Sequence, residues 1–180
     1  MDVEVSLQEH FYDDPAEVTI VQVKRNDPHS PYDSPHYEDY CRLHGIRGAA
    51  RASQDAFITR GMNDNSTFGT VLVDAGNDSA HHLRRIICGR VAKYPGALLQ
   101  NGLAHANALG FRTVTFALPD LMFVDRQLMV SGFGDEVGLR DVIKLQAGDP
   151  GNTIESLRIV VEYNTTLAHW LHVELGLNKI

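Results

Sequence analysis

Hydrophobic and polar positions alternate most clearly in three segments of the chain, and each predicts a β-strand. Residues 16–25 (AEVTIVQVKR) and 68–74 (FGTVLVD) are rich in Val and Ile, and residues 111–119 (FRTVTFALP) end at a proline. A period of two is typical of a strand with one buried face. Residues 126–133 (RQLMVSGF) are predicted as a further strand.

Helical spacing of apolar residues appears in other segments. Residues 95–110 begin with a proline, carry leucines mostly on one side and end at Gly110, as expected of a helix with a proline in its first turn. Residues 136–148 predict a short helix, and residues 38–58 predict another despite two glycines. The tail over residues 153–177 is predicted as helical, with its RIVVEY stretch as an alternative strand.

The segment GNDSAHHLRRIICG (76–89) fits two structures. Leu83, Ile86 and Ile87 have helical spacing, whereas the Gly-Asn turn just after a strand favours the return strand of a hairpin. Since strands and helices interleave, we expect an α+β sandwich in which one face of the sheet packs on helices.

Composition narrows the function. The 180 residues carry a net charge of −7, and no run of Lys or Arg exceeds two. A nucleic-acid duplex is therefore not an expected partner, although a small anionic ligand is compatible with a few local donors. The two cysteines lie far apart, no signal peptide is visible and no apolar stretch approaches about 18 residues, so we expect a cytoplasmic protein without a membrane span.

Histidines and aspartates are the first chemical candidates. His81 and His82 would point to opposite faces of a strand, which makes them a poor metal-binding pair. His169 and His172 share a helix face without an evident third ligand. A metal site at these residues, or at His29 and His36 in the proline-rich loop, stays an alternative to ordinary surface positions. Turn chemistry alone accounts for the aspartates near predicted turns, which are Asp74, Asp78, Asp120 and Asp125.

Four short motifs in order resemble the formaldehyde-activating enzyme family. They are LVDAGNDSAH (72–81), NGLAHANALGF (101–111), PDLMFVDRQLM (119–129) and AGDPGN (147–152), and they lie within residues 68–152, about 85 of the 180 residues. The resemblance implies a two-layer fold like a domain of ribosomal protein S5, with residues 76–89 as a hairpin. It also implies a homopentamer with small-molecule sites between subunits.

The family condenses formaldehyde with tetrahydromethanopterin to the methylene derivative, a carbon-nitrogen lyase reaction. The resemblance places a catalytic acid at His81, since a group with a pKa near neutral suits protonation of a leaving hydroxide. It implies substrate-binding positions at Asn152, His82 and Thr115, a reduced pterin as co-substrate and no metal.

The sequence departs from the family pattern at places that contact the pterin. Leu83, Gly132 and Gly134 replace an acid, a lysine and a threonine. Residues 1–65 have no counterpart, so they are predicted to be an N-terminal extension to a domain over residues 66–180. The departures favour an alternative in which a paralogue binds a pterin or another small molecule without catalysis. A histidine-based metal protein is the second alternative.

Overall fold

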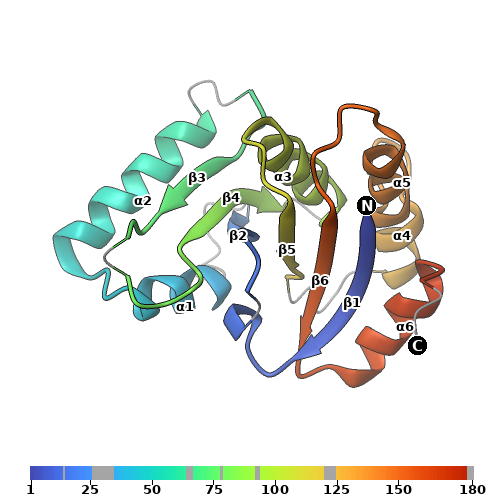
Figure 1. The fold of residues 1–180 in the computed structure, drawn as a ribbon, viewed down its shortest axis with the longest axis horizontal. Coiled ribbons are helices and arrows are strands. Elements are labelled where there is room, and N and C mark those ends of the chain that lie inside the picture. Colours follow the sequence, from blue (N-terminus) through green and yellow to red (C-terminus); the bar gives the residue numbers. More distant parts are fainter. Residues whose placement is uncertain are drawn as a thin grey trace.

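The computed structural model describes residues 1–13, 15–25, 35–63, 67–77, 79–91, 94–119 and 125–177. In this part of the chain, six strands form one sheet in the order β1-β6-β5-β2-β4-β3 (Figure 1). All neighbouring strands are parallel except β3 and β4, which form an antiparallel hairpin. The strands are β1 (Asp2–Gln8), β2 (Val18–Arg25), β3 (Val71–Asp74), β4 (Arg85–Val91), β5 (Thr113–Ala117) and β6 (Ser156–Glu162).

Helices cover both faces of this sheet, as Figure 1 shows with α1 and α2 on its left and α4 and α5 on its right. The helical elements are η1 (Phe11–Asp13), α1 (Pro35–Leu43), α2 (Gly48–Asn63), α3 (Gly96–Ala108), α4 (Arg126–Ser131), α5 (Leu139–Gly148) and α6 (Thr165–Glu174). The structure therefore has three layers, with the sheet in the middle.

The alternation of buried side chains along the strands produces two separate hydrophobic cores. In β2, Val18 and Ile20 pack toward α3, α4, α5 and α6, whereas Val21 and Val23 pack toward α1 and α2. A near-continuous apolar run is typical of a strand that is buried on both faces. The expected α+β class fits this single mixed sheet, but the S5-like two-layer sandwich is wrong because the second face is apolar and covered as well.

Several predicted elements are confirmed. Strands β2, β3 and β5, helices α3 and α5 and the hairpin turn lie where the periodicity placed them. Gly110 has a φ of 78° and follows the end of α3, where the N–H of Phe111 bonds the carbonyl of Ala106. This positive φ explains the glycine, because a side chain would be strained there.

Other predicted elements are wrong, and a helix cap and two glycines explain two of them. Residues 126–131 form α4 instead of a strand, because the Asp125 carboxylate accepts hydrogen bonds from the N–H groups of Gln127 and Leu128. The segment 38–58 is divided between α1 and α2 by two glycines with positive φ, Gly45 and Gly48. In the tail, the alternative strand over RIVVEY is confirmed as β6, and the helix is confined to α6, which Asn164 caps. The sequence analysis did not identify β1.

The strands from residues 1–65 lie in the same sheet as the later strands. β1 pairs with β6, and β2 lies between β5 and β4. Strands from both sides of the predicted boundary at residue 65 therefore belong to one sheet. In the described residues, no helix combines the length and the apolar character needed to cross a membrane.

Candidate functional site

The carboxyl ends of β2, β4 and β5 meet at one edge of the sheet, because these strands are parallel neighbours. The chain leaves β2 through α1 and α2 on one face and reaches β4 by way of β3. It then crosses to the opposite side of β2 through α3, on the other face, to form β5. The connections thus diverge at β2. Open α/β sheets bind ligands in the crevice outside the carboxyl ends of strands at such a switch point.

Helix α3 begins at this edge, shortly after β4. Its N-cap residue is Pro95, which supplies no side-chain hydrogen bond to the first turn. The first N–H groups of a helix carry partial positive charge and favour anions. Tyr94 and Gly96 beside the cap are buried, whereas Ala97 in the first turn is exposed.

Glycines let the connection between α4 and α5 pack directly against the start of α3. A Cβ on Gly96 would overlap the carbonyl oxygen of Val137, and a Cβ on Gly132 would lie 2.6 Å from the carbonyl oxygen of Glu136. Gly132 and Gly134 also have φ values of 77° and 60°. Backbone conformation and close packing therefore explain the glycines at these positions. The α4–α5 connection is held against the start of α3 at this edge of the sheet.

His81 lies in the loop between β3 and β4, not on a strand. It lines a cavity of about 580 Å³, and its Nδ1 accepts a hydrogen bond of 3.1 Å from the N–H of Leu83. The rings of His81 and His82 stack at 4.5 Å, so the expectation that they point to opposite faces is wrong. Burial, reinforced by the neighbouring His82 and His44, lowers the pKa of His81.

The other three predicted binding residues lie in different environments. His82 is exposed next to His81. Asn152 lies in the turn between α5 and β6, where it lines a second cavity, of about 550 Å³, and bonds the N–H and carbonyl of Ile154. Thr115 is fully buried in β5, in register between Thr19 and Arg158. Of the four predicted site residues, only His81 lines the first cavity and only Asn152 lines the second. Each assignment therefore stays a separate prediction.

The histidines proposed as metal ligands are dispersed. His36 lies in α1 and bonds the carboxylate of Glu162, and His169 and His172 lie on α6. His29 falls outside the described residues. Among the residues that the structure describes, no group of three or more His, Cys, Asp or Glu side chains is arranged to hold a metal ion.

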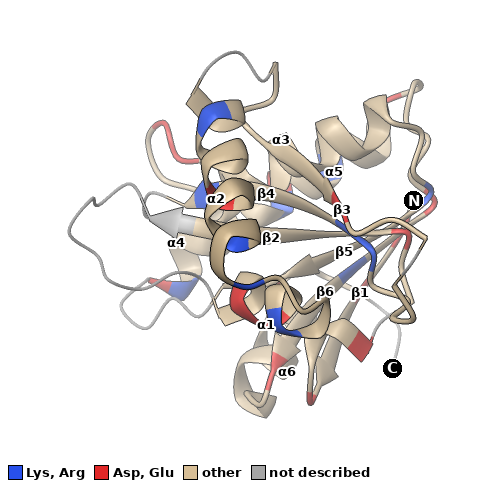
Figure 2. Cartoon of the chain, turned by 90° about the vertical axis from the view of Figure 1, so that its left-hand side faces the viewer, with Lys and Arg blue, Asp and Glu red and all other residues tan. Residues whose placement is uncertain are grey.

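Charged residues of both signs are interspersed on α1 and α2 (Figure 2). Glu38 and Asp55 pair with Arg51, and Asp39 pairs with Arg42, which neutralises much of this face. The named charges on this face are therefore paired within the protein. An anionic ligand would depend on local donors such as those at the start of α3.

Solved structures with the same fold are macrodomains. The macro domain of ganglioside induced differentiation associated protein 2 aligns with a TM-score of 0.65 at 12% identity, over 98% of this chain and 86% of that one. A Trypanosoma brucei macrodomain aligns with a TM-score of 0.58 at 10% identity, over 92% of this chain and 64% of that one. No protein-family model and no curated protein matches the sequence.

A third similar structure is the Oceanobacillus iheyensis macrodomain with ADP. It aligns with a TM-score of 0.54 at 12% identity, over 97% of this chain and 90% of that one. At these identities the likeness establishes the fold, which is a macrodomain fold.

The resemblance to the formaldehyde-activating enzymes is therefore wrong, together with the activity derived from it. The lyase reaction, the tetrahydromethanopterin co-substrate and the related functional terms are overturned by the macrodomain fold. The homopentamer loses its basis, because only the resemblance supported it. Two of the matching motifs are a Gly-Asn turn and a helix end at Gly110 and Phe111. Such turns recur in unrelated folds because they reflect local backbone chemistry.

The carboxyl edge of the sheet was not identified as a site from the sequence. Its residues follow strands that the periodicity located correctly, but the strand order was unknown. The useful signal was the Tyr-Pro-Gly stretch at 94–96 directly after one strand and before a helix. This spacing places a helix N-terminus beside the carboxyl end of a strand.

Proposed function

We propose that this protein binds ADP, or a nucleotide that contains ADP, in the crevice outside the carboxyl ends of β2, β4 and β5. The observation that carries the proposal is the switch point at β2, where the helical connections diverge to opposite faces. The likeness to a macrodomain whose structure contains ADP supports this ligand class.

The chemistry of the edge suits a diphosphate better than an uncharged ligand. The first turn of α3 supplies backbone N–H donors and the positive end of a helix dipole without a side-chain cap. The net charge of −7 means that recognition rests on these local donors and not on the field of the whole protein. The earlier idea of a small-molecule-binding protein is thus kept, with a nucleotide as the ligand in place of a pterin.

Isothermal titration of the full chain with ADP, AMP and adenosine tests the proposal. We expect ADP to bind and each removed phosphate to weaken affinity. Ala97→Glu adds a carboxylate to the exposed first turn of α3, where it favours the helix but repels a diphosphate. We expect this variant to lose at least about tenfold in ADP affinity, equivalent to about 1.4 kcal/mol, without loss of thermal stability.

Ala108→Glu is the matched control. It makes the same change at the exposed C-terminal end of the same helix, away from the carboxyl ends of the strands. ADP affinity should be retained in this variant. Equal affinity for ADP and adenosine, or equal losses in the two glutamate variants, would contradict a diphosphate site at the start of α3.

A further inference from the structure

The cavity beside His81 contains a serine and a histidine in hydrogen-bond contact. Ser79 Oγ lies 2.8 Å from His44 Nδ1, and His44 Nε2 lies 2.6 Å from the carbonyl oxygen of Leu83. A carbonyl oxygen only accepts hydrogen bonds, so Nε2 carries a proton. In the neutral imidazole, Nδ1 then presents its lone pair to Ser79, and the Ser79 hydroxyl donates to it.

His44 is held firmly in this orientation. It follows the last turn of α1, where its N–H bonds the carbonyl of Tyr40, and its ring lies 4.5 Å from the Tyr40 ring. Tyr40 is itself fully buried and donates its hydroxyl proton to the carbonyl of Arg84. The next residue, Gly45, has a φ of 64°, which lets the chain turn away and leaves the imidazole beside the cavity.

The arrangement has the three parts of an activated nucleophile. The hydroxyl of Ser79 faces the base His44, and the Leu83 carbonyl orients that base. Ser79 is half-buried and lines the cavity together with His44 and His81. The remaining lining residues are the small or apolar Leu43, Ile46, Ala75 and Ala80, and the volume is about 580 Å³.

His81 also lines this cavity. Its Nδ1 is occupied by the Leu83 N–H, so the neutral ring carries its proton on Nε2. Burial lowers the pKa of His81, which favours this neutral form at pH 7. An N–H at this place is suited to an oxygen that gains negative charge during attack by Ser79.

We propose that Ser79 and His44 form a second, hydrolytic site that cleaves esters of short acyl groups. Ser79 Oγ forms a bond to the ester carbonyl carbon while its proton passes to His44 Nδ1, and the carbonyl π electrons move onto oxygen. The intermediate collapses with cleavage of the bond to the alcohol oxygen, which takes the proton from Nδ1. Water then adds to the acyl-serine by the same route, giving the carboxylic acid and free Ser79. This site is independent of the nucleotide crevice, because the β3–β4 loop precedes β4 and lies at the opposite edge of the sheet.

Covalent labelling of the full chain with an alkyl fluorophosphonate, followed by peptide mass spectrometry, tests this proposal. We expect Ser79 to be labelled and p-nitrophenyl acetate to be hydrolysed with saturation. Ser79→Ala should lose the label and on the order of 100-fold in hydrolysis rate. Ser53→Ala is the matched control, because Ser53 is exposed on α2 away from the cavity.

His44→Gln separates the base from its structural role. A glutamine amide still donates to the Leu83 carbonyl, but it takes no proton from Ser79. We expect a folded protein with the same melting temperature and at least a tenfold loss of labelling. His81→Ala should slow hydrolysis, because it removes the proposed donor beside Ser79. Labelling of Ser79 no faster than of Ser53, or hydrolysis unchanged in Ser79→Ala, overturns the proposal.

Discussion

Gly102 of α3 lies directly against Ile20 of β2. A Cβ on Gly102 would be 2.7 Å from Cδ1 and 2.8 Å from Cγ2 of Ile20, and the latter side chain is fully buried. The helix backbone thus packs on the central strand of the sheet without an intervening side chain. This contact holds α3 close to β2 and positions its first turn at the carboxyl edge.

Gly102→Ala should destabilise the fold, although alanine is the better helix former. The gain in helix propensity is about 1 kcal/mol, whereas forcing a methyl group into a packed core costs about 1–3 kcal/mol. We expect a net loss of about 1 kcal/mol in the free energy of unfolding, measured with urea. Ile20→Val removes the nearest methyl group, so the double variant should lose less than the sum of the two single losses. An additive result would contradict direct contact.

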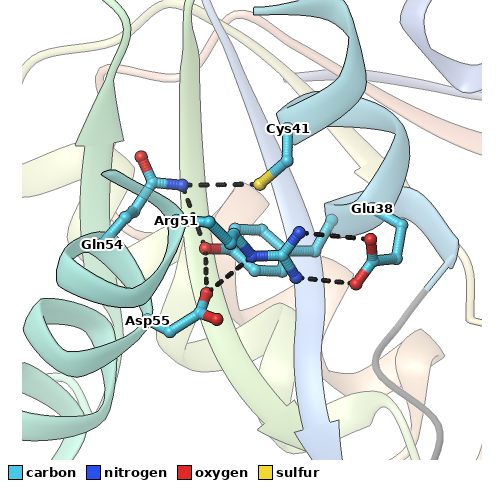
Figure 3. Close-up of polar contacts among 6 residues, drawn as sticks. Glu38, Cys41, Arg51, Gln54 and Asp55 are labelled. Atoms are coloured by element: carbon cyan, nitrogen blue, oxygen red, sulfur yellow. Dashed lines mark hydrogen bonds and ion pairs between the residues drawn. The ribbon is translucent and has the colours of Figure 1, made fainter. Parts of the chain in front are cut away.

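Arg51 links α1 to α2 through several contacts at once, as Figure 3 shows. Its guanidinium bonds Glu38 and Asp55 and lies 4.6 Å above the ring of Tyr37. Lysine offers a point charge in place of a planar fork, so it makes few of these contacts. We expect Arg51→Lys and Arg51→Ala to lower the free energy of unfolding by similar amounts, about 1 kcal/mol after allowance for the partial exposure of both carboxylates.

Arg42→Ala is the control for this prediction. Arg42 pairs with Asp39 on the same helix, but its side chain is 60% exposed. Its removal should leave the melting temperature unchanged. If Arg51→Lys retains full stability, a positive charge alone is sufficient and the planar contacts have no measurable effect.

The two cysteines should be unreactive in the folded protein. Cys41 and Cys88 are 2% and 0% exposed, and burial raises the pKa of both thiols. The thiolate is the reactive form, so both low access and a raised pKa slow alkylation. At pH 8 we expect iodoacetamide to modify each thiol at least about 100-fold more slowly than in urea, since reaction requires opening of the fold. Rapid labelling of one cysteine in native buffer would show that its part of the core opens readily.

Acid should destabilise the protein partly through His105. Nδ1 of this half-buried histidine lies in a 2.9 Å hydrogen bond with Thr70 Oγ1, and the ring stacks on Phe68. Burial lowers the pKa of His105 from the usual 6.5. The unfolded chain then binds the proton at a higher pH than the folded protein. The contribution of neutral His105 to the free energy of unfolding is therefore fully present above about pH 6.5. It is lost as the pH falls through the pKa of His105 in the folded protein.

His105→Gln should reduce this pH dependence. Glutamine retains a polar contact to Thr70 but does not titrate, so the variant should lose less free energy of unfolding between pH 7.5 and pH 5 than the original protein. Denaturant unfolding at several pH values measures the difference. Parallel curves for the two proteins would assign the acid sensitivity to other groups, among which His81 also has a pKa lowered by burial.

Local patterns predicted the elements better than their arrangement. The alternation over residues 16–25 located β2, and Pro95 with Gly110 located α3. The same local rules misassigned residues 126–131, where a single carboxylate at Asp125 decides for helix over strand. The carboxyl-edge site depends on the pairing of β2 with β5, whose register joins Val18 to Val114. Nothing within either segment specifies that partner.

The cavity site illustrates the same limit from a different direction. The histidine pair in the sequence pointed to His81, which lines the cavity in the structure. His44 and Ser79 lie 35 residues apart in the sequence, and their contact depends on the packing of the end of α1 against the β3–β4 loop. Sequence spacing carries no signal for a pair of this kind.

The pairing of β1 with β6 determines the order in which the fold can be completed. Asp2 pairs with Ser156, and Gln8 pairs with Glu162, so the first strand of this sheet in chain order is hydrogen-bonded to the last. During synthesis, β1 has no neighbour in this sheet until more than 150 residues have followed. Contacts of such long sequence separation slow folding and leave strand edges exposed meanwhile. Closure of β1 onto β6 is therefore expected to be a late step in folding.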